Sequence, residues 1–351
     1  MKQILITGGA GFIGTNFVRY VLEHTSFAGP IVVADKLTYA GNLKNLSGLT
    51  HQFPNRFFFE QADIHNAAQM DTLFSRYQID TVCHFAAESH VDRSIVHPDD
   101  FIQTNIVGTF TLLELARKYK TSLFHHVSTD EVYGSLGKTG LFAESMPYDP
   151  SSPYSASKAA SDHLVRAYWR TYGVPVTISN CSNNYGPYQF PEKLIPLMLY
   201  NARHRKPLPV YGSGQNVRDW LYVTDHCRAI WVIMTRGRRG ETYNIGGRCE
   251  KTNIEVVEAI CDLVDREQND DALFSTRDLI KYVKDRPGHD LRYAIDDTKL
   301  RTELGFEPEE TFETGLQKTA DWYQENAPWV EEIQTKAQQK EWLTQNYTNR
   351  I

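Results

Sequence analysis

Short runs of apolar residues recur along the first half of the chain, each bounded by polar or turn-forming residues. Their length and their lack of alternation predict strands that are buried on both faces, as in a parallel sheet. We place these strands at residues 3–7, 31–34, 56–60, 81–85, 122–127 and 175–180. Between them, apolar residues recur at helical spacing, most clearly at residues 67–77, 100–119 and 154–172. Alternating strands and helices predict an α/β fold with a doubly wound parallel (Rossmann) sheet.

The pattern changes after residue 182. The turn-rich segment 183–191 leads into a second lobe, because its Asn, Gly and Pro residues break regular structure. Further helices are predicted at residues 193–205, 253–267, 297–304 and 311–324, with an extended segment at residues 207–212. We therefore predict a Rossmann domain (1–182), a smaller α/β substrate-binding lobe (183–328) from which the chain can cross back to the first, and a helical tail (329–351).

Composition and charge narrow the class of protein. The 37 basic and 43 acidic residues are well mixed and give a net charge of -6, which offers no basic surface to nucleic acid or to an anionic membrane. The five cysteines form no Cys-x-x-Cys pair, which argues against a disulfide framework and a zinc site. Nowhere do about 18 apolar residues run together, and the first apolar run is too short for a signal peptide. We expect a cytoplasmic protein without a metal.

A glycine-rich turn, Gly8-Gly-Ala-Gly11-Phe-Ile-Gly14, follows the first strand and precedes a helical pattern. Such glycines permit a tight turn, let backbone N–H groups approach a pyrophosphate, and let the helix pack close to the strand. Asp35 ends the second strand, near the expected spacing of about 20 residues past the turn. Its carboxylate would accept hydrogen bonds from ribose hydroxyls and repel a 2′-phosphate, which favours NAD over NADP. The neighbouring Lys36 weakens that preference.

Two further segments follow predicted strands at the same edge of the sheet. The small residues of segment 86–90 would let the backbone lie against a dinucleotide. Asp63 and Ile64 follow the third strand, where the acid either contacts the adenine edge or caps the helix that begins at residue 67. Spacing leaves both interpretations open.

The densest set of residues suited to proton transfer follows the fifth strand. Thr129, Asp130 and Glu131 come at its carboxyl tip, where ligands bind in open α/β sheets. On the next helix, Tyr154 and Lys158 are one turn apart on one face. A nearby ammonium favours the phenolate, so we expect Lys158 to lower the pKa of Tyr154. Each feature alone is common in structural roles, and the glycine turn upstream is what favours a catalytic one.

Two other features bear on partners. The helix predicted at residues 100–119 carries apolar residues on two faces, which, together with the Tyr154 helix, predicts a homodimer with a four-helix interface. Arg218, Arg286 and His289 are cations in polar loops of the second lobe. Isolated cations in loops are usually solvated. The alternative is that these three side chains bind the phosphates of a ligand.

On the glycine turn, Asp35 and Tyr154-x-x-x-Lys158, the chain resembles the extended short-chain dehydrogenase/reductase superfamily, whose members act on nucleotide sugars. Stretches 35–42, 86–94, 128–134 and 285–289 are similar to its dTDP-glucose 4,6-dehydratase family. The Thr-Asp-Glu triplet at 129–131 is the most specific part, because related 4-epimerases usually carry a serine and no adjacent acid pair there.

The resemblance implies a hydro-lyase that uses NAD to convert dTDP-glucose to dTDP-4-keto-6-deoxyglucose, a product class that feeds deoxysugar synthesis such as that of rhamnose. It implies Tyr154 as the base for the C4 hydroxyl, Lys158 as its pKa partner and ribose ligand, and Thr129 as the hydrogen-bond partner of the C4 oxygen. Glu131 would take the C5 proton, and Asp130 would protonate the departing C6 hydroxyl.

The candidate binding residues complete these expectations. Those expected to bind NAD are Gly8, Gly11, Phe12, Ile13, Gly14, Asp35, Lys36, Leu37, Thr38, Asp63, Ile64, Phe85, Ala86, Ala87, Glu88, Ser89, Thr104, Tyr154, Lys158 and Asn184. Those expected to bind the nucleotide sugar are Ser89, Thr129, Asn183, Lys193, Leu194, Pro209, Val210, Tyr211, Arg218, Asn253, Asp285, Arg286 and His289.

Two alternatives stay open. The same Tyr–Lys pair would serve another nucleotide-sugar 4,6-dehydratase, a 4-epimerase or a decarboxylase. The reaction of an epimerase does not require the acid Asp130. A regulatory protein that senses NAD would need the fold but not the pair. No physical argument predicts from the residues of segment 207–212 whether the nucleotide base is thymine or uracil.

Overall fold

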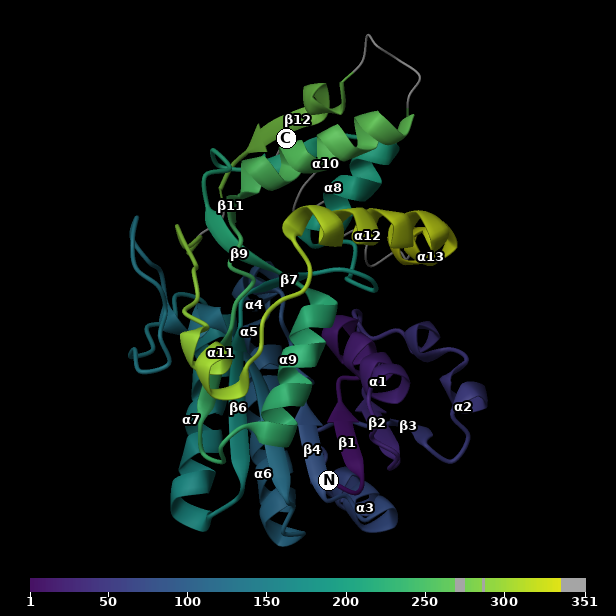
Figure 1. The fold of residues 1–351 in the computed structure, drawn as a ribbon, viewed down its shortest axis with the longest axis vertical. Coiled ribbons are helices and arrows are strands. Elements are labelled where there is room, and N and C mark those ends of the chain that lie inside the picture. The colour runs from purple at the N-terminus through teal and green to yellow at the C-terminus, as the bar shows by residue number, and fades with distance from the viewer. Residues whose placement is uncertain (269–274, 286–287, 336–351) are drawn as a thin grey trace.

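The computed structural model of the protein describes residues 1–268, 275–285 and 288–335, and its central layer is a seven-stranded sheet (Figure 1). The strands lie in the order β10-β6-β5-β4-β1-β2-β3, and every neighbouring pair is parallel. Their bounds are β1 Ile4–Thr7, β2 Ile31–Asp35, β3 Phe57–Gln61, β4 Thr81–His84, β5 Leu123–Thr129, β6 Val176–Cys181 and β10 Thr242–Ile245. The predicted Rossmann fold is confirmed, and β10 is an added strand.

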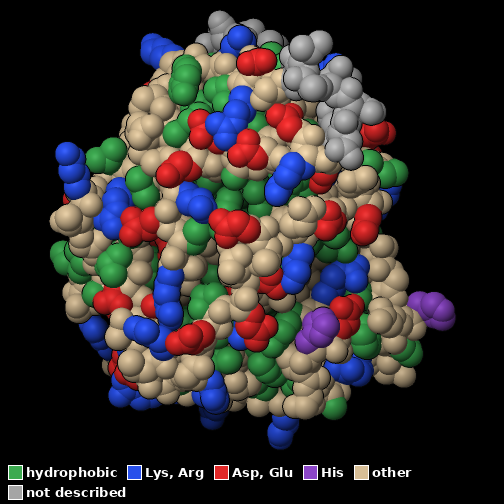
Figure 2. All heavy atoms as spheres, turned by 45° about the horizontal axis from the view of Figure 1, so that its top comes forward, with side chains coloured by type: hydrophobic (Ala, Val, Ile, Leu, Met, Phe, Trp, Pro, Cys, Tyr) green, Lys and Arg blue, Asp and Glu red, His purple; other side chains and the backbone are tan. Residues whose placement is uncertain are grey.

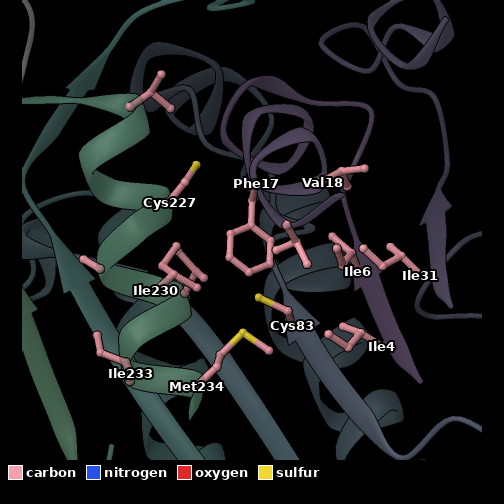
Figure 3. Packing of buried hydrophobic residues seen from close by; sticks show 14 of the residues in the cluster. Ile4, Ile6, Phe17, Val18, Ile31, Cys83, Cys227, Ile230, Ile233 and Met234 are labelled. Carbon is pink, nitrogen blue, oxygen red and sulfur yellow. The ribbon is translucent and has the colours of Figure 1, made fainter. Parts of the chain in front are cut away.

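Helices cover both faces of this sheet. One face carries α1 Phe12–His24 and α9 Val223–Arg236, and the other carries α3 Ala67–Tyr77, α6 Thr109–Lys118 and α7 Pro153–Tyr172. Successive residues of a strand point to opposite faces, so Ile4 and Ile6 enter the first core while Leu5 enters the second. Figure 3 shows Phe17 of α1 between Ile230 of α9 and the strand residues around Cys83.

The segment predicted as one helix at residues 100–119 is more irregular. It comprises α5 Pro98–Phe101, a π-helical stretch Ile102–Gly108 and then α6. At its end Gly108 lies against Ile64, where a Cβ atom would come within 2.5 Å of the Ile64 side chain. The π-helical stretch also places Asn105 where its side chain bonds the backbone of Glu88 in both directions, at 2.9 and 3.0 Å. Tertiary contacts of this kind cannot be read from apolar spacing.

The second lobe lies above the carboxyl edge of the sheet (Figure 1). It contains a three-stranded sheet in the order β11-β9-β7, a two-stranded sheet of β12 and β8, and a core shared with its helices. Its strands are β7 Asn183–Tyr185, β8 Leu208–Tyr211, β9 Val217–Tyr222, β11 Glu250–Thr252 and β12 Ile280–Val283. Its helices are α8 Leu194–Arg203, α10 Asn253–Gln268, α12 Phe312–Glu325 and α13 Ala327–Thr335.

The chain crosses between the lobes more than once. After β9 it returns through α9 to β10, which pairs with β6, and α11 Thr298–Leu304 also packs beside β10. The division at residues 182 and 328 stays a prediction. The predicted tail helix begins within α13, and its remainder from residue 336 lies outside the described residues.

The described surface agrees with the mixed charge of the sequence. On the face shown in Figure 2, acidic and basic side chains alternate without a large patch of either sign. None of the helices in the described ranges is long and apolar enough to cross a lipid bilayer.

We expect Phe17→Ala to lower the free energy of unfolding by about 3–5 kcal/mol, because it empties a fully buried site between α1, α9 and the sheet. Urea unfolding followed by circular dichroism measures the loss. The control, Leu141→Ala, changes a side chain that is 47% exposed and should stay within about 0.5 kcal/mol of the parent protein. Equal losses in the two variants would contradict this account of the core.

Candidate active site

The turn between β1 and α1 is closely packed against the end of β4. Gly8 has a φ of +71°, and a Cβ atom there would lie 2.6 Å from the backbone nitrogen of Ala86. A Cβ atom on Gly14 would lie 2.2 Å from the carbonyl oxygen of Gly8. Both positions therefore require glycine, as a turn that admits a pyrophosphate does.

The acid at the end of β2 is held in a fixed orientation. Asp35 Oδ2 accepts a hydrogen bond from the backbone of Ala10 at 2.9 Å, and Oδ1 accepts one from Leu37 at 2.8 Å. Burial raises the pKa of Asp35, and these two bonds act against that rise. The carboxylate is thus aligned at the pocket edge, where ribose hydroxyls would meet it.

The structure excludes one of the two interpretations of Asp63, and contact with the adenine edge stays a prediction. The cap of α3 is Asn66, whose side chain accepts a hydrogen bond from the backbone of Gln69, so the capping role for Asp63 is wrong. Asp63 instead lines the pocket and forms an ion pair with Lys36, 2.6 Å between Oδ2 and Nζ. Because this pair balances the lysine charge, Lys36 offers less attraction to a 2′-phosphate than an isolated cation would.

A single pocket runs from the glycine turn to the tips of β5 and β6. All five residues predicted for proton transfer line it, as do the predicted substrate residues Ser89, Asn183 and Lys193. Of the predicted NAD-binding residues, the lining contains Gly8, Gly11, Phe12, Ile13, Gly14, Asp35, Lys36, Thr38, Asp63, Ile64, Phe85, Ala86, Ala87, Glu88, Ser89, Thr104, Tyr154, Lys158 and Asn184. Leu37 lies outside it and contributes its backbone N–H to Asp35. The glycine cradle and the aligned acid fit a dinucleotide.

The remaining predicted substrate residues are not part of this lining. They lie in the second lobe: Leu194 begins α8, Pro209, Val210 and Tyr211 belong to β8, Arg218 to β9, Asn253 begins α10, and Asp285 and His289 follow β12. Arg286 lies outside the described residues.

Contacts across the lobes bring part of this set near the pocket. The Tyr211 hydroxyl donates to Asp92 Oδ2 at 3.2 Å, and Lys193 Nζ donates to the carbonyl oxygen of Ser89 at 3.4 Å. His289 Nδ1 lies 2.6 Å from Asp285 Oδ1. The predicted residues thus extend from the pocket into the second lobe.

Arg218 corrects one expectation. It lies in strand β9 rather than in a polar loop, and it is 5% exposed. Its guanidinium donates to the carbonyl oxygens of Val217 and Asp290 and lies 4.3 Å from the centre of the Tyr293 ring. An arginine held in this way is preorganised, because burial, hydrogen bonds and the ring fix its orientation.

Thr129 connects the tip of β5 to the acid pair. Its hydroxyl accepts a hydrogen bond from the backbone of Glu131 at 3.3 Å and caps the short 3-10 helix Asp130–Tyr133. The same hydroxyl lies 3.3 Å from Asp130 Oδ1. The sequence order therefore places the hydroxyl and both acids in one turn at the pocket.

The two acids have different surroundings. Asp130 is 2% exposed, and Oδ2 is buried with no hydrogen-bond partner in the described part of the chain, whereas Glu131 is half-buried. Burial raises the pKa of Asp130 well above its ordinary value, and the carboxylates of Glu131 and Asp219 raise it further. Asp130 is therefore suited to hold a proton at neutral pH and to donate it.

The expected effect of Lys158 on Tyr154 is wrong for this structure. Burial raises the pKa of Tyr154 well above its ordinary value, and the charge of Glu131 adds to the rise. Lys158 Nζ donates to the carbonyl oxygen of Val127 at 2.8 Å, and burial lowers its pKa to about 8. The reason is that both side chains are deeply buried, and loss of hydration is the largest cause of each shift.

Several lining residues were missed from the sequence. Glu192 is 2% exposed and forms an ion pair with Arg93, 3.0 Å between Oε2 and Nη2. The Arg93 guanidinium also lies 3.7 Å from the centre of the Tyr39 ring. Tyr39 falls in a stretch that carried the family resemblance, but no spacing rule pairs Arg93 with Glu192. The other lining residues that were missed are Ala34, Ala40, Gly41, Ala62, Val127, Ser128, Cys181, Ser182, Gln189 and Phe190.

The fold and the site together define an extended short-chain dehydrogenase/reductase. Its features are a Rossmann sheet, a glycine turn, an aligned acid at the end of β2 and a Tyr-x-x-x-Lys helix that lines the same pocket. The family model described as GDP-mannose 4,6 dehydratase matches residues 5–319. The chain is 55% identical to a dTDP-glucose 4,6-dehydratase of Salmonella typhimurium, over 99% of each chain. Within the superfamily, the chain belongs to the dTDP-glucose 4,6-dehydratases.

Solved structures agree with this assignment. A dTDP-glucose 4,6-dehydratase from Bacillus anthracis, crystallised in complex with NAD, is 48% identical, with a TM-score of 0.84 over 95% of this chain and 100% of that chain. Another from Streptomyces venezuelae, with NAD and TYD bound, is 46% identical, with a TM-score of 0.87 over 94% of this chain and 99% of that chain.

We expect Asp130→Asn to stabilise the protein increasingly as pH rises from 4 to 8. An aspartate whose pKa is raised on folding opposes folding once the unfolded chain ionises, so its cost grows with pH until the folded group ionises too. Asparagine removes that cost. Thermal unfolding at several pH values measures the difference in Tm from the parent protein. A difference in Tm that is the same at every pH for Asp130→Asn would contradict the raised pKa.

Proposed function

We propose that the protein is a NAD-dependent hydro-lyase that converts dTDP-glucose to dTDP-4-keto-6-deoxyglucose. The observation that carries this proposal is the acid pair beside Tyr154, in which a buried Asp130 with a raised pKa adjoins a half-buried Glu131. Elimination of water needs both a base and an acid, and two carboxyl groups in different environments can divide these tasks. The relatives, each named dTDP-glucose 4,6-dehydratase, support the choice of substrate.

NAD, held by the glycine turn and Asp35, would supply the hydride chemistry that oxidises C4 of the sugar and reduces C6. Tyr154 accepts the proton of the C4 hydroxyl, and Thr129 holds the C4 oxygen by a hydrogen bond. Because burial and Glu131 raise the pKa of Tyr154, the tyrosine needs positive charge nearby to act as a base. Lys158, one helical turn away and lining the same pocket, supplies that charge and a donor for the ribose.

The acid pair completes the elimination. Once C4 is a ketone, the hydrogen on C5 is acidic, and the Glu131 carboxylate removes it. Asp130 gives its proton to the C6 hydroxyl, which leaves as water. The raised pKa of Asp130 favours the protonated form, from which this proton is given. A 4-epimerase would need neither step.

Binding of the nucleotide sugar spans both lobes. We assign the diphosphate to Lys193 and to the fixed guanidinium of Arg218, with Arg286 as a further cation from the sequence. Ser89, Asn183 and Lys193 contact substrate from the pocket, and the second-lobe residues Leu194, Pro209, Val210, Tyr211, Asn253, Asp285 and His289 enclose the rest. The product would feed deoxysugar synthesis, such as that of rhamnose, in the cytoplasm.

We expect dTDP-glucose incubated with the protein in heavy water to give a product that has lost one water and gained one deuterium, even without added NAD. Mass spectrometry detects this change. No change of mass with added NAD and with UDP-sugars as well would contradict the proposed function and favour a sensor of NAD. Conversion of a nucleotide sugar without loss of water would favour an epimerase.

Glu131→Gln removes the base but keeps the shape of the side chain, so it should still allow oxidation at C4 while slowing water loss by about 10²–10⁴-fold. Absorbance of reduced cofactor and product mass, followed together, separate the two steps. Glu309→Gln, at a side chain that is 70% exposed, is the matched control. Water loss at the parental rate in Glu131→Gln would show that another group takes the C5 proton.

We also propose a homodimer through the helical face formed by the π-helical stretch, α6 and α7. Ile102 and Phe110 are 45% and 46% exposed on this face, and Tyr172 at the end of α7 is 49% exposed. Two such helical segments from each copy would bury these side chains in a four-helix interface. A chain of 40.2 kDa should then sediment as a dimer at micromolar concentration.

We expect Phe110→Asp to shift sedimentation to the monomer, because the charge would be buried at the interface. The control, Leu141→Asp, changes another exposed apolar residue and should leave the dimer intact. A parent protein that sediments as a monomer would contradict the proposal.

A further inference from the structure

The helix that carries Tyr154 and Lys158 bears a third polar residue on the same face. Asp162 follows Lys158 by one turn on α7, and its side chain is fully buried. It does not line the pocket, and it is buried behind Lys158, which does. A fully buried carboxylate behind a proton-transfer site requires an explanation, because isolated buried charge is costly.

Three side chains surround this carboxylate. His126 Nε2 lies 3.2 Å from Oδ1, and Oδ2 accepts hydrogen bonds from Ser128 at 2.9 Å and Tyr148 at 2.8 Å. Although burial acts to raise it, the hydrogen bonds of His126 and Ser128 and the charge of Lys158 hold the pKa of Asp162 below its ordinary value. Asp162 is therefore a buried anion.

The cluster connects directly to Lys158. Lys158 Nζ lies 3.5 Å from the same Nε2 atom of His126 that faces Asp162, and it donates to Val127 O. His126 and Ser128 precede and follow Val127 in β5. One short segment of strand thus holds both the ammonium and the carboxylate.

The titratable groups facing Lys158 come from four elements. They are Tyr154 and Asp162 on α7, His126 on β5, Cys181 on β6 and His84 on β4. Burial lowers the pKa of His84 and of His126, the latter to about 4, and raises that of Cys181 and of Tyr154, so these four are neutral at pH 7. Within this described set, Asp162 is the group that carries negative charge.

We propose that Asp162 is a positioning residue for the proposed reaction, whose carboxylate is the buried counter-charge that keeps the Lys158 ammonium charged and in place at the pocket. The inference rests on the proposed function for the task of Lys158, although the contacts themselves do not depend on it. Asp162 acts on the chemistry through Lys158 and the shared segment of β5.

The test follows the titration of Lys158 directly, by nuclear magnetic resonance of protein labelled with carbon-13 at lysine Cε, with Lys158→Met to assign the signal. The parent protein should titrate near pH 8. The Asp162 charge raises the pKa of Lys158 against the effect of burial, so its loss in Asp162→Asn should lower the midpoint by about 1 pH unit or more. The same variant should bind NAD several-fold more weakly at pH 8 by calorimetry, and the alkaline limb of its kcat profile should move to lower pH.

A matched control separates this effect from general loss of structure. Asp225 is also buried, and it accepts hydrogen bonds from the backbone of Glu309 and Glu310 and pairs with Arg228 away from the pocket. Asp225→Asn should reduce Tm but leave the Lys158 midpoint unchanged. Asp162→Asn with a Lys158 midpoint and an NAD affinity equal to those of the parent protein would overturn the proposal.

If Asp162→Asn does not fold, Asp162→Glu tests the same proposal. It keeps the charge but moves the carboxylate, so Lys158 should still titrate near pH 8 while NAD binds more weakly. Parental NAD affinity and kcat in this variant would overturn the positioning role. Both binding and titration are read without any sugar, so a protein that fails to dehydrate dTDP-glucose but shows these shifts would refute the proposed function and leave standing the role of Asp162 as the counter-charge of Lys158.

Discussion

A sheet made only of parallel strands must be covered on both faces, because its strands are apolar on both sides and every crossover needs a helix. In this protein the requirement is met by α1 and α9 on one face and by α3, α6 and α7 on the other. It also brings the carboxyl ends of all seven strands to one edge. The glycine turn, Asp35, the acid pair and the loop after β4 meet there because each of them lies at, or directly after, the end of a strand.

Burial then determines the electrostatics of the site more than any single pair of charges does. Loss of hydration raises the pKa of Asp130 and Tyr154 and lowers that of Lys158, and each shift favours the neutral form. The first shift suits the proposed role of Asp130, since a neutral carboxyl group can donate a proton. The protein opposes the last by placing Asp162 behind the lysine. Loss of hydration thus favours the neutral form at Asp130, whereas at Lys158 the charge of Asp162 acts against it.

Much of this could be predicted from the sequence because the signals are local. Strand ends, the glycine turn, Asp35 and the Tyr154–Lys158 spacing depend on residues that are near each other along the chain. The pKa of Tyr154 could not be predicted, since it depends on how deeply α7 packs against β5 and β6. The pairing of Arg93 with Glu192 and the addition of β10 to the sheet join residues far apart in sequence. Only the folded chain defines such contacts.

The return of the chain to the first lobe has a consequence for how such a protein can change. Because α9, β10 and α11 belong to the Rossmann part but lie between segments of the second lobe, no single cut separates the two. Genetic recombination at one crossover point cannot exchange the second lobe as a module. A new sugar or nucleotide preference must instead arise through individual substitutions in segments already interleaved with the cofactor-binding part.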